Sequence, residues 1–251
     1  MNKDTSWGSV ADWYEEHLAG DDTYHAKVIA PNVMRILAPK KGMRVLDLGC
    51  GEGYFSRMFR SSGAEVVGVD IAKELVEKAK RQRGDIEYVV SDAKDLSFAQ
   101  NNSFDAIVCV LALQNMERLE PVFKECERVL RHDGRFLFVL NHPVFRIAKR
   151  SSWGWDETLK AQYRRLDGYL SARREKIDMS PGKGTGDATW SFHRSLQDYA
   201  KALAGAEFAV TKMEEWISHK KSEKGPRQSA EDIARKEFPL FLAVEVSLLV
   251  R

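Results

Sequence analysis

The sequence predicts an α/β fold with a doubly wound sheet of seven strands, the last of which runs antiparallel to the others. Three observations lead to this prediction. Short apolar strands alternate with amphipathic helices between residues 44 and 140. A glycine-rich turn, Gly-Cys-Gly-Glu-Gly at 49–53, joins the first of these strands to its helix. The last two apolar runs, 208–214 and 240–250, are joined by a charged segment that we interpret as a loop too short for a crossover helix on the same face.

The individual elements follow from hydrophobic periodicity, taken in chain order. Two helices are expected first, over 7–18 and 22–38, with Asp22 as the N-cap of the second and Pro39 as its stop. Strands are then expected at 44–48, 65–70, 86–90, 105–111, 135–140, 208–214 and 240–250. Helices are expected at 53–61, 73–82 and 119–131, and from a Ser195-x-x-Asp198 capping box to about residue 204.

This order divides the chain into four parts. Residues 1–41 form N-terminal helices that we expect to close over a ligand, and residues 42–142 form the ligand-binding core. The alternation breaks at Pro143, so residues 143–190 are interpreted as a cap that selects the substrate. Residues 191–251 contribute a helix and the two strands that complete the sheet.

The composition fits a cytosolic globular protein. The 251 residues are 43% hydrophobic and 30% charged, and a net charge of +2 gives no overall signature of a nucleic-acid binder. The three cysteines have no metal-ligand spacing, so we expect reduced thiols and no metal site. The first residues are polar, and no apolar run has the length of a membrane span. We expect a soluble, cytoplasmic monomer or homodimer.

The glycine turn predicts the kind of ligand. Gly49, Gly51 and Gly53 let the backbone bend sharply and approach a ligand where a Cβ would collide. Asp70 ends the next strand, where a carboxylate can accept both hydroxyls of a ribose. A nucleoside-containing cofactor is therefore expected. The dinucleotide fingerprint needs a glycine where this chain has Tyr54, which disfavours an NAD-dependent oxidoreductase.

The tighter Gly-x-Gly-x-Gly spacing, with Asp47 in front, resembles motif I of the class I S-adenosylmethionine (SAM)-dependent methyltransferases. Three further elements of that family follow in order: Asp70 after the second strand, Ser-Asp-Ala at 91–93, and the fourth strand ending at Leu111. The resemblance covers nearly the whole chain and points to the type 11 group, which includes the ubiquinone and menaquinone C-methyltransferases. It implies a Rossmann-like sheet, SAM as cofactor and S-adenosylhomocysteine as product.

The resemblance also implies roles for individual residues. Asp47 would help hold the methionine end, beside bare amides of the glycine turn, while Asp70 would take the ribose and Asp92 the adenine amino group. The cofactor-binding residues expected on this basis are Tyr14, Tyr24, His25, Asp47, Gly49, Gly51, Gly53, Asp70, Ile71, Asp92, Ala93 and Leu111. Packing within helices is the alternative role for the N-terminal aromatic residues.

Candidate substrate and catalytic residues lie at and after the break in the pattern. If the acceptor is a hydroxyl or an acidic carbon, His142 or His193 is the expected proton acceptor, with a structural role as the alternative for each. Arg194 could pair with a substrate carboxylate or phosphate. The substrate-contacting residues expected are Gln114, Asn141, Trp153, Trp155, Trp190 and Arg194. The tryptophans could instead form the small core of the cap.

These observations favour a methyltransferase that moves a methyl group from SAM to a small molecule by in-line displacement. Two alternatives remain open at this point. The acceptor could be RNA, reached through the basic cap and the charged segment 218–236, although no appended RNA-binding module is visible. The protein could also bind SAM without catalysing a reaction.

Overall fold

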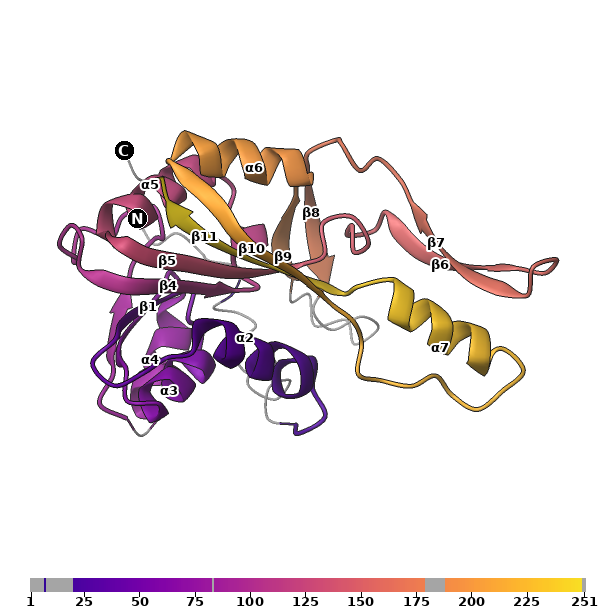
Figure 1. The fold of residues 1–251 in the computed structure, drawn as a ribbon, viewed down its shortest axis with the longest axis horizontal. Coiled ribbons are helices and arrows are strands. Elements are labelled where there is room, and N and C mark those ends of the chain that lie inside the picture. The colour runs from indigo at the N-terminus through magenta and orange to yellow at the C-terminus, as the bar shows by residue number, and fades with distance from the viewer. Residues whose placement is uncertain (1–6, 8–19, 83, 179–187, 250–251) are drawn as a thin grey trace.

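A seven-stranded sheet forms the centre of the protein (Figure 1). The computed structural model describes residues 7, 20–82, 84–178 and 188–249. The strand order across the sheet is β10-β11-β5-β4-β1-β2-β3. The strands are β1 (Arg44–Leu48), β2 (Glu65–Asp70), β3 (Glu87–Val90), β4 (Phe104–Val110), β5 (Leu130–Asn141), β10 (Phe208–Trp216) and β11 (Phe241–Leu248). Because β11 pairs antiparallel with both β5 and β10 while the other pairs are parallel, the predicted sheet is confirmed.

Helices cover both faces of this sheet (Figure 1). They are α2 (Ala30–Leu37), preceded by a π-helical turn His25–Ile29, α3 (Tyr54–Ser61), α4 (Lys73–Arg81), α5 (Glu120–Val129) and α6 (Leu196–Gly205). The two largest buried apolar clusters result, one containing Phe123 and Leu203 and the other containing Val33 and Phe59. Burial on both faces explains why the strands read as nearly continuous apolar runs.

The helix boundaries agree with the sequence in part. The capping box at Ser195 and Asp198 is present, as predicted. The prediction of Asp22 as an N-cap is wrong: the amide of Ala26 donates to Thr23 Oγ1, and Asp22 accepts a hydrogen bond from His219 Nε2 at 2.9 Å. The helix expected over 7–18 lies outside the described residues, except for Trp7.

The cap region contains strands that the sequence did not predict. β6 (Ser151–Asp156) pairs with β7 (Ala161–Leu166), and β8 (Arg173–Asp178) pairs with β9 (Ala188–His193), both antiparallel. The glycine-rich stretch 181–186 lies outside the described residues.

The segment between β10 and β11 also differs from the prediction, because it contains helix α7 (Gln228–Glu237). This helix does not cross the sheet. It projects away from the sheet and contacts β7 (Figure 1), so β11 still returns antiparallel to β10. Within the described part of the chain, no helix combines the length and apolar character that crossing a bilayer requires.

Candidate active site

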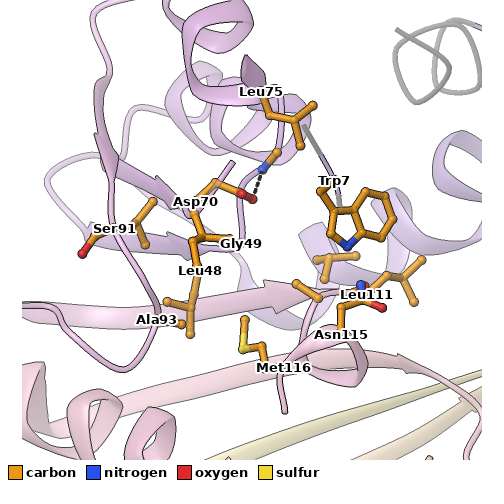
Figure 2. Close-up of a pocket in the computed structure, with 15 residues that line it drawn as sticks. Trp7, Leu48, Gly49, Asp70, Leu75, Ser91, Ala93, Leu111, Asn115 and Met116 are labelled. Carbon is orange, nitrogen blue, oxygen red and sulfur yellow. Dashed lines mark hydrogen bonds between the residues drawn. The ribbon is translucent and has the colours of Figure 1, made fainter. Parts of the chain in front are cut away.

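A pocket lies at the carboxyl ends of β1, β2 and β4 (Figure 2), between the glycine turn 49–53 and the segment 111–116. Open parallel sheets bind their ligands at this edge. The pocket brings together six of the residues expected to bind the cofactor: Gly49, Gly51, Asp70, Ile71, Ala93 and Leu111.

The glycine turn is shaped by backbone conformations that favour glycine. Gly49 and Gly53 have φ angles of 74° and 81°, in the left-handed region. A Cβ on Gly49 would lie 2.5 Å from the Cβ of Ala112, and a Cβ on Gly53 would lie 2.2 Å from Tyr88 Oη. Any larger residue at either position would therefore push the turn away from its neighbours.

The expectation of bare amides along this turn is wrong. The amides of Gly49 and Cys50 both donate to the carbonyl of Val69, at 2.8 and 3.0 Å. The amide of Gly51 donates to Asp70 Oδ2, and that of Gly53 donates to the carbonyl of Cys50. Three of these donors fix the turn against β2 and the fourth bonds within the turn, so the amides of the three glycines are already used.

Asp70 is held in place by backbone amides. Its Oδ2 accepts from the amide of Gly51 at 2.9 Å, and its Oδ1 accepts from the amide of Ala72 at 2.8 Å. Burial raises the pKa of Asp70, and the bonds from Ala72 and Gly51 oppose this rise. The amide of Ile71 also bonds this carboxylate. Since a carboxylate has about four acceptor positions, capacity remains to accept a bond from a ribose hydroxyl.

Asp47 lies beneath the glycine turn and is not among the residues that line the pocket. Its Oδ2 accepts from Ser56 Oγ on α3 at 2.5 Å. Burial raises the pKa of Asp47 to about 7, against the effect of the Ser56 bond, and the nearby charge of Asp70 raises it further. The hydrogen bond between Asp47 and Ser56 therefore links β1 to α3.

The remaining lining suits an adenosyl group. Apolar side chains, among them Leu75, Ala93 and Met116, form walls that fit a flat base. Asp70 fits a ribose, and the space left by Gly49 fits the amino-acid tail. The residues present therefore fit SAM. Among the described residues, no group of three or more His, Cys, Asp or Glu side chains is placed to hold a metal ion.

Trp7 is a pocket residue that the sequence analysis did not select. Figure 2 shows its ring over the pocket near Leu111 and Asn115, and it packs against Ala72 and Leu75. An aromatic residue directly after the polar residues 1–6 was the available signal. The expectation that residues 1–41 close over the cofactor remains a prediction beyond this contact.

The other residues expected at the cofactor lie elsewhere or are not described. Tyr24 Oη forms a hydrogen bond with Ser218 Oγ at 3.1 Å, and buried His25 lies beside the Tyr54 ring; neither lines the pocket. Asp92 forms an ion pair with Lys94 at 3.0 Å and also does not line it. Tyr14 lies outside the described residues.

A second cavity, of about 470 Å³, adjoins the same 111–116 segment. Four residues expected to serve substrate or catalysis line it: Gln114, Asn141, His193 and Arg194. Residues 111, 112, 115 and 116 line the first pocket and residue 114 lines the second, so this segment forms a wall of both.

The two candidate histidines differ in their surroundings. His142 is buried outside the cavity: its Nδ1 accepts from the amide of Val144 at 3.2 Å, so its Nε2 donates to Glu215 Oε1 at 2.7 Å. This arrangement favours a structural role. His193 lines the cavity, and its Nε2 donates to the carbonyl of Tyr169 at 2.7 Å. In the neutral ring, this bond leaves Nδ1 as the proton acceptor.

Arg194 and the tryptophans also have specific partners. Arg194 Nη2 donates to the carbonyls of Met116 and Glu117, at 2.7 and 2.6 Å, which ties α6 to the wall shared by both cavities. The three tryptophans are not among the residues that line the second cavity. Trp153 packs against Phe238, Trp155 lies under Arg227, and Trp190 lies under Arg174.

Comparison with known proteins places this site in context. Residues 46–138 match the family model of the methyltransferase domain. Over 106 residues the chain is 38% identical to a ubiquinone biosynthesis O-methyltransferase of Xanthomonas oryzae pv. oryzae. This match covers 40% of this chain and 44% of the relative. It is 36% identical over 106 residues to a demethylmenaquinone methyltransferase of Paenarthrobacter aurescens, which covers 42% of each chain. The chain thus matches less than half the length of these curated relatives.

A solved structure covers much more of the chain. The crystal structure of an S-adenosylmethionine-dependent methyltransferase from Mesorhizobium loti has a TM-score of 0.68 to this protein and is 28% identical to it. The similarity covers 86% of this chain and 95% of that chain.

The sheet order and the glycine turn define a Rossmann-like protein whose pocket at Asp70 suits a nucleoside. The comparisons narrow this class: the chain has the fold of the class I SAM-dependent methyltransferases, and residues 46–138 match the model of the methyltransferase domain. The resemblance read from the sequence, including its type 11 group, is confirmed, and SAM is the cofactor of this class.

Proposed function

We propose that this protein transfers a methyl group from SAM to a small-molecule acceptor held in the second cavity. The observation that carries the proposal is the shared wall: the segment 111–116 lines the cofactor pocket and the second cavity at once. SAM supplies the electrophilic methyl group. The protein's own contribution is to hold the acceptor in line with that group, and such orientation can lower a barrier by roughly 7–11 kcal/mol.

The shared wall is built to keep one shape. Leu111 has a φ of 54°, an uncommon value for a residue with a branched side chain. Its carbonyl accepts from Gln114 Nε2 at 2.8 Å and from Asn115 Nδ2 at 3.2 Å. Residues held in such conformations are concentrated at functional sites. We infer that these bonds set the position of the acceptor relative to the cofactor pocket.

His193 is the group proposed to accept a proton from a hydroxyl acceptor. The carbonyl of Tyr169 holds the proton on Nε2, and Nδ1 has no hydrogen-bond partner among the described residues. A neutral imidazole with this tautomer is ready to accept a proton as the methyl group transfers. An acceptor that carries no acidic proton would not need this step.

Two measurements test the proposal. S-adenosylhomocysteine should raise the melting temperature, because it binds the native form alone. Incubation with a metabolite extract and SAM carrying a labelled methyl group should then yield a labelled small molecule. Label in RNA alone, or tight binding of S-adenosylhomocysteine with no labelled product, would reject the small-molecule assignment.

A matched pair of variants tests the base. His193→Gln should lower turnover about a hundredfold, within the usual range for general base catalysis, with little change in S-adenosylhomocysteine affinity. His132→Gln makes the same change at an exposed position near the opposite end of β5 and should leave turnover unchanged. Equal turnover in the two variants would remove His193 from the chemistry.

A further inference from the structure

The second cavity has a strongly cationic lining on one side. Arg146 and Lys149 line it together with His193 and Arg194, and Asp178 is the single carboxylate among its described lining residues. Lys149 forms an ion pair with Glu175 at 3.8 Å, so the positive charge that lacks a carboxylate partner is that of Arg146. The positively charged lining therefore favours a negatively charged ligand.

Arg194 is not the best anchor for an anion, although the sequence suggested it. Three of its contacts are to backbone carbonyls, and two of them run from Nη2 to Met116 at the end of the shared wall and to the next residue, Glu117. A guanidinium engaged in this way stabilises the site, and it has few donors left for a ligand.

Arg146 has the opposite character. Among the described residues, its side chain forms one hydrogen bond, from Nη1 to Asn141 Oδ1 at 2.7 Å, and most of its five N–H donors are not used by them. It lies over the ring of Phe241, 5.4 Å from the centroid. No carboxylate forms an ion pair with Arg146 among the residues that the structure describes.

A second arginine, Arg164, adds positive charge near Arg146. Arg146 is exposed to solvent, yet the surrounding protein lowers the pKa of its guanidinium by desolvation; Tyr24 opposes this effect, and the charge of Arg164 adds to it. Within the described part of the chain, Arg164 likewise donates to neutral groups alone, the carbonyl of Phe145 and Ser151 Oγ. Two like charges held in partly desolvated positions are relieved when an anion binds.

We propose that the methyl acceptor is an anion, a small molecule whose carboxylate or phosphate binds Arg146, with the rest of the molecule extending along the wall formed by Gln114 and His193. The statement that this anion is the methyl acceptor rests on the proposed function. The statement that an anion binds Arg146 does not. A planar guanidinium with free paired donors suits both carboxylate and phosphate, which it binds through two parallel hydrogen bonds.

The test is direct binding to the full chain saturated with S-adenosylhomocysteine. Benzoate and inorganic phosphate should each raise the melting temperature, and benzamide, which has the shape of benzoate without its charge, should not. Arg146→Gln should weaken both anions by roughly tenfold or more. Arg146→Lys should keep part of the effect, which separates lost charge from lost folding.

Arg150→Gln is the matched control, because it removes the same charge from an exposed arginine that does not line the cavity. Its response to both anions should equal that of the unaltered protein. The inference is overturned if neither anion binds, if benzamide binds as well as benzoate, or if Arg146→Gln binds the anions unchanged.

The same samples separate this inference from the proposed function. Labelled methyl transfer is measured with a metabolite extract divided by an anion-exchange column. Label confined to the retained, anionic fraction supports the inference, and label confined to the unretained fraction overturns it. Anion binding through Arg146 without methyl transfer to either fraction would leave the anion site standing and reject the methyltransferase activity.

Discussion

Replacing Gly49 by alanine adds one methyl group, yet it should disrupt the cofactor pocket strongly. Two costs add at this position. A residue other than glycine in the left-handed region costs about 1–2 kcal/mol, and the φ of Gly49 is 74°. The added Cβ would also lie 2.5 Å from the Cβ of Ala112, a separation that real Cβ atoms essentially never show. The turn and the shared wall must therefore move apart.

The required movement sets the expected magnitude. Restoring an ordinary contact between the two carbons needs a shift of about 1 Å, and a misplacement of this size can cost roughly a hundredfold in rate. The shift also strains the bonds from the amides of Gly49 and Cys50 to Val69, each worth about 0.5–1.5 kcal/mol. We expect S-adenosylhomocysteine affinity, measured by calorimetry, to fall at least tenfold in Gly49→Ala.

Gly42 provides the control. Its φ is 80°, close to that of Gly49, but a Cβ there would meet nothing within 4 Å. Gly42→Ala should lower the free energy of unfolding by the backbone cost alone and leave cofactor affinity unchanged. Adding Ala112→Gly to Gly49→Ala should restore part of the affinity, because it removes the colliding atom. Equal affinity in Gly42→Ala and Gly49→Ala, or no rescue by the second change, would refute the reasoning.

Three further predictions concern the same pocket. Asp70→Ala should weaken S-adenosylhomocysteine by about a hundredfold in calorimetry, since two hydrogen bonds to a charged group are lost, each worth about 1.5–3 kcal/mol; a Kd within threefold of the original would remove Asp70 from the ribose. Asp47 has a folded pKa of about 7, above the value of 3.8 expected when unfolded, so the native state holds a proton that the unfolded state lacks between these values. The free energy of unfolding should therefore fall by up to ~1.4 kcal/mol per pH unit as pH rises through this range. Asp47→Asn should remove this pH dependence, as measured by urea unfolding. The same pH dependence in both proteins would contradict the raised pKa of Asp47. Trp7→Ala should weaken S-adenosylhomocysteine by up to roughly tenfold through lost aromatic contact, and unchanged binding would place Trp7 outside the occupied pocket.

The core of the fold was predictable because its signals are local and strong. Apolar runs buried on both faces, a glycine turn and an acidic strand end determine β1, α3 and β2 almost without tertiary information. The doubly wound parallel sheet was predicted from the alternation of strands and helices. The antiparallel direction of β11 was predicted from a connection to β10 expected to be too short for a crossover helix, and the direction is correct although that connection contains α7. Asp70 could be assigned to the pocket for the same reason, since its role depends on a position at the end of a strand.

The cap could not be predicted in this way. β7 and β8 carry charged residues in adjacent positions, such as Arg173 and Arg174, so they lack the alternation of apolar and polar residues that identifies a half-buried strand. The role of Arg194 depends on carbonyls at 116 and 117, which are 78 and 77 residues away in sequence. Trp7 acquires its place only through Ala72 and Leu75. Contacts of this range leave no periodic trace in the sequence.

The meeting of α7 with the β6–β7 hairpin has a consequence for how this protein can be re-engineered. The hairpin and the helix come from different parts of the chain. Arg227, just before α7, nevertheless lies 4.5 Å from the centroid of the Trp155 ring and donates a hydrogen bond to Glu157 at 3.2 Å. Trp153 likewise rests on Phe238. Transferring either the β6–β7 hairpin or the α7 segment alone into a related enzyme would expose Trp153 and Trp155 to solvent. The two segments therefore have to be transferred, or removed, together.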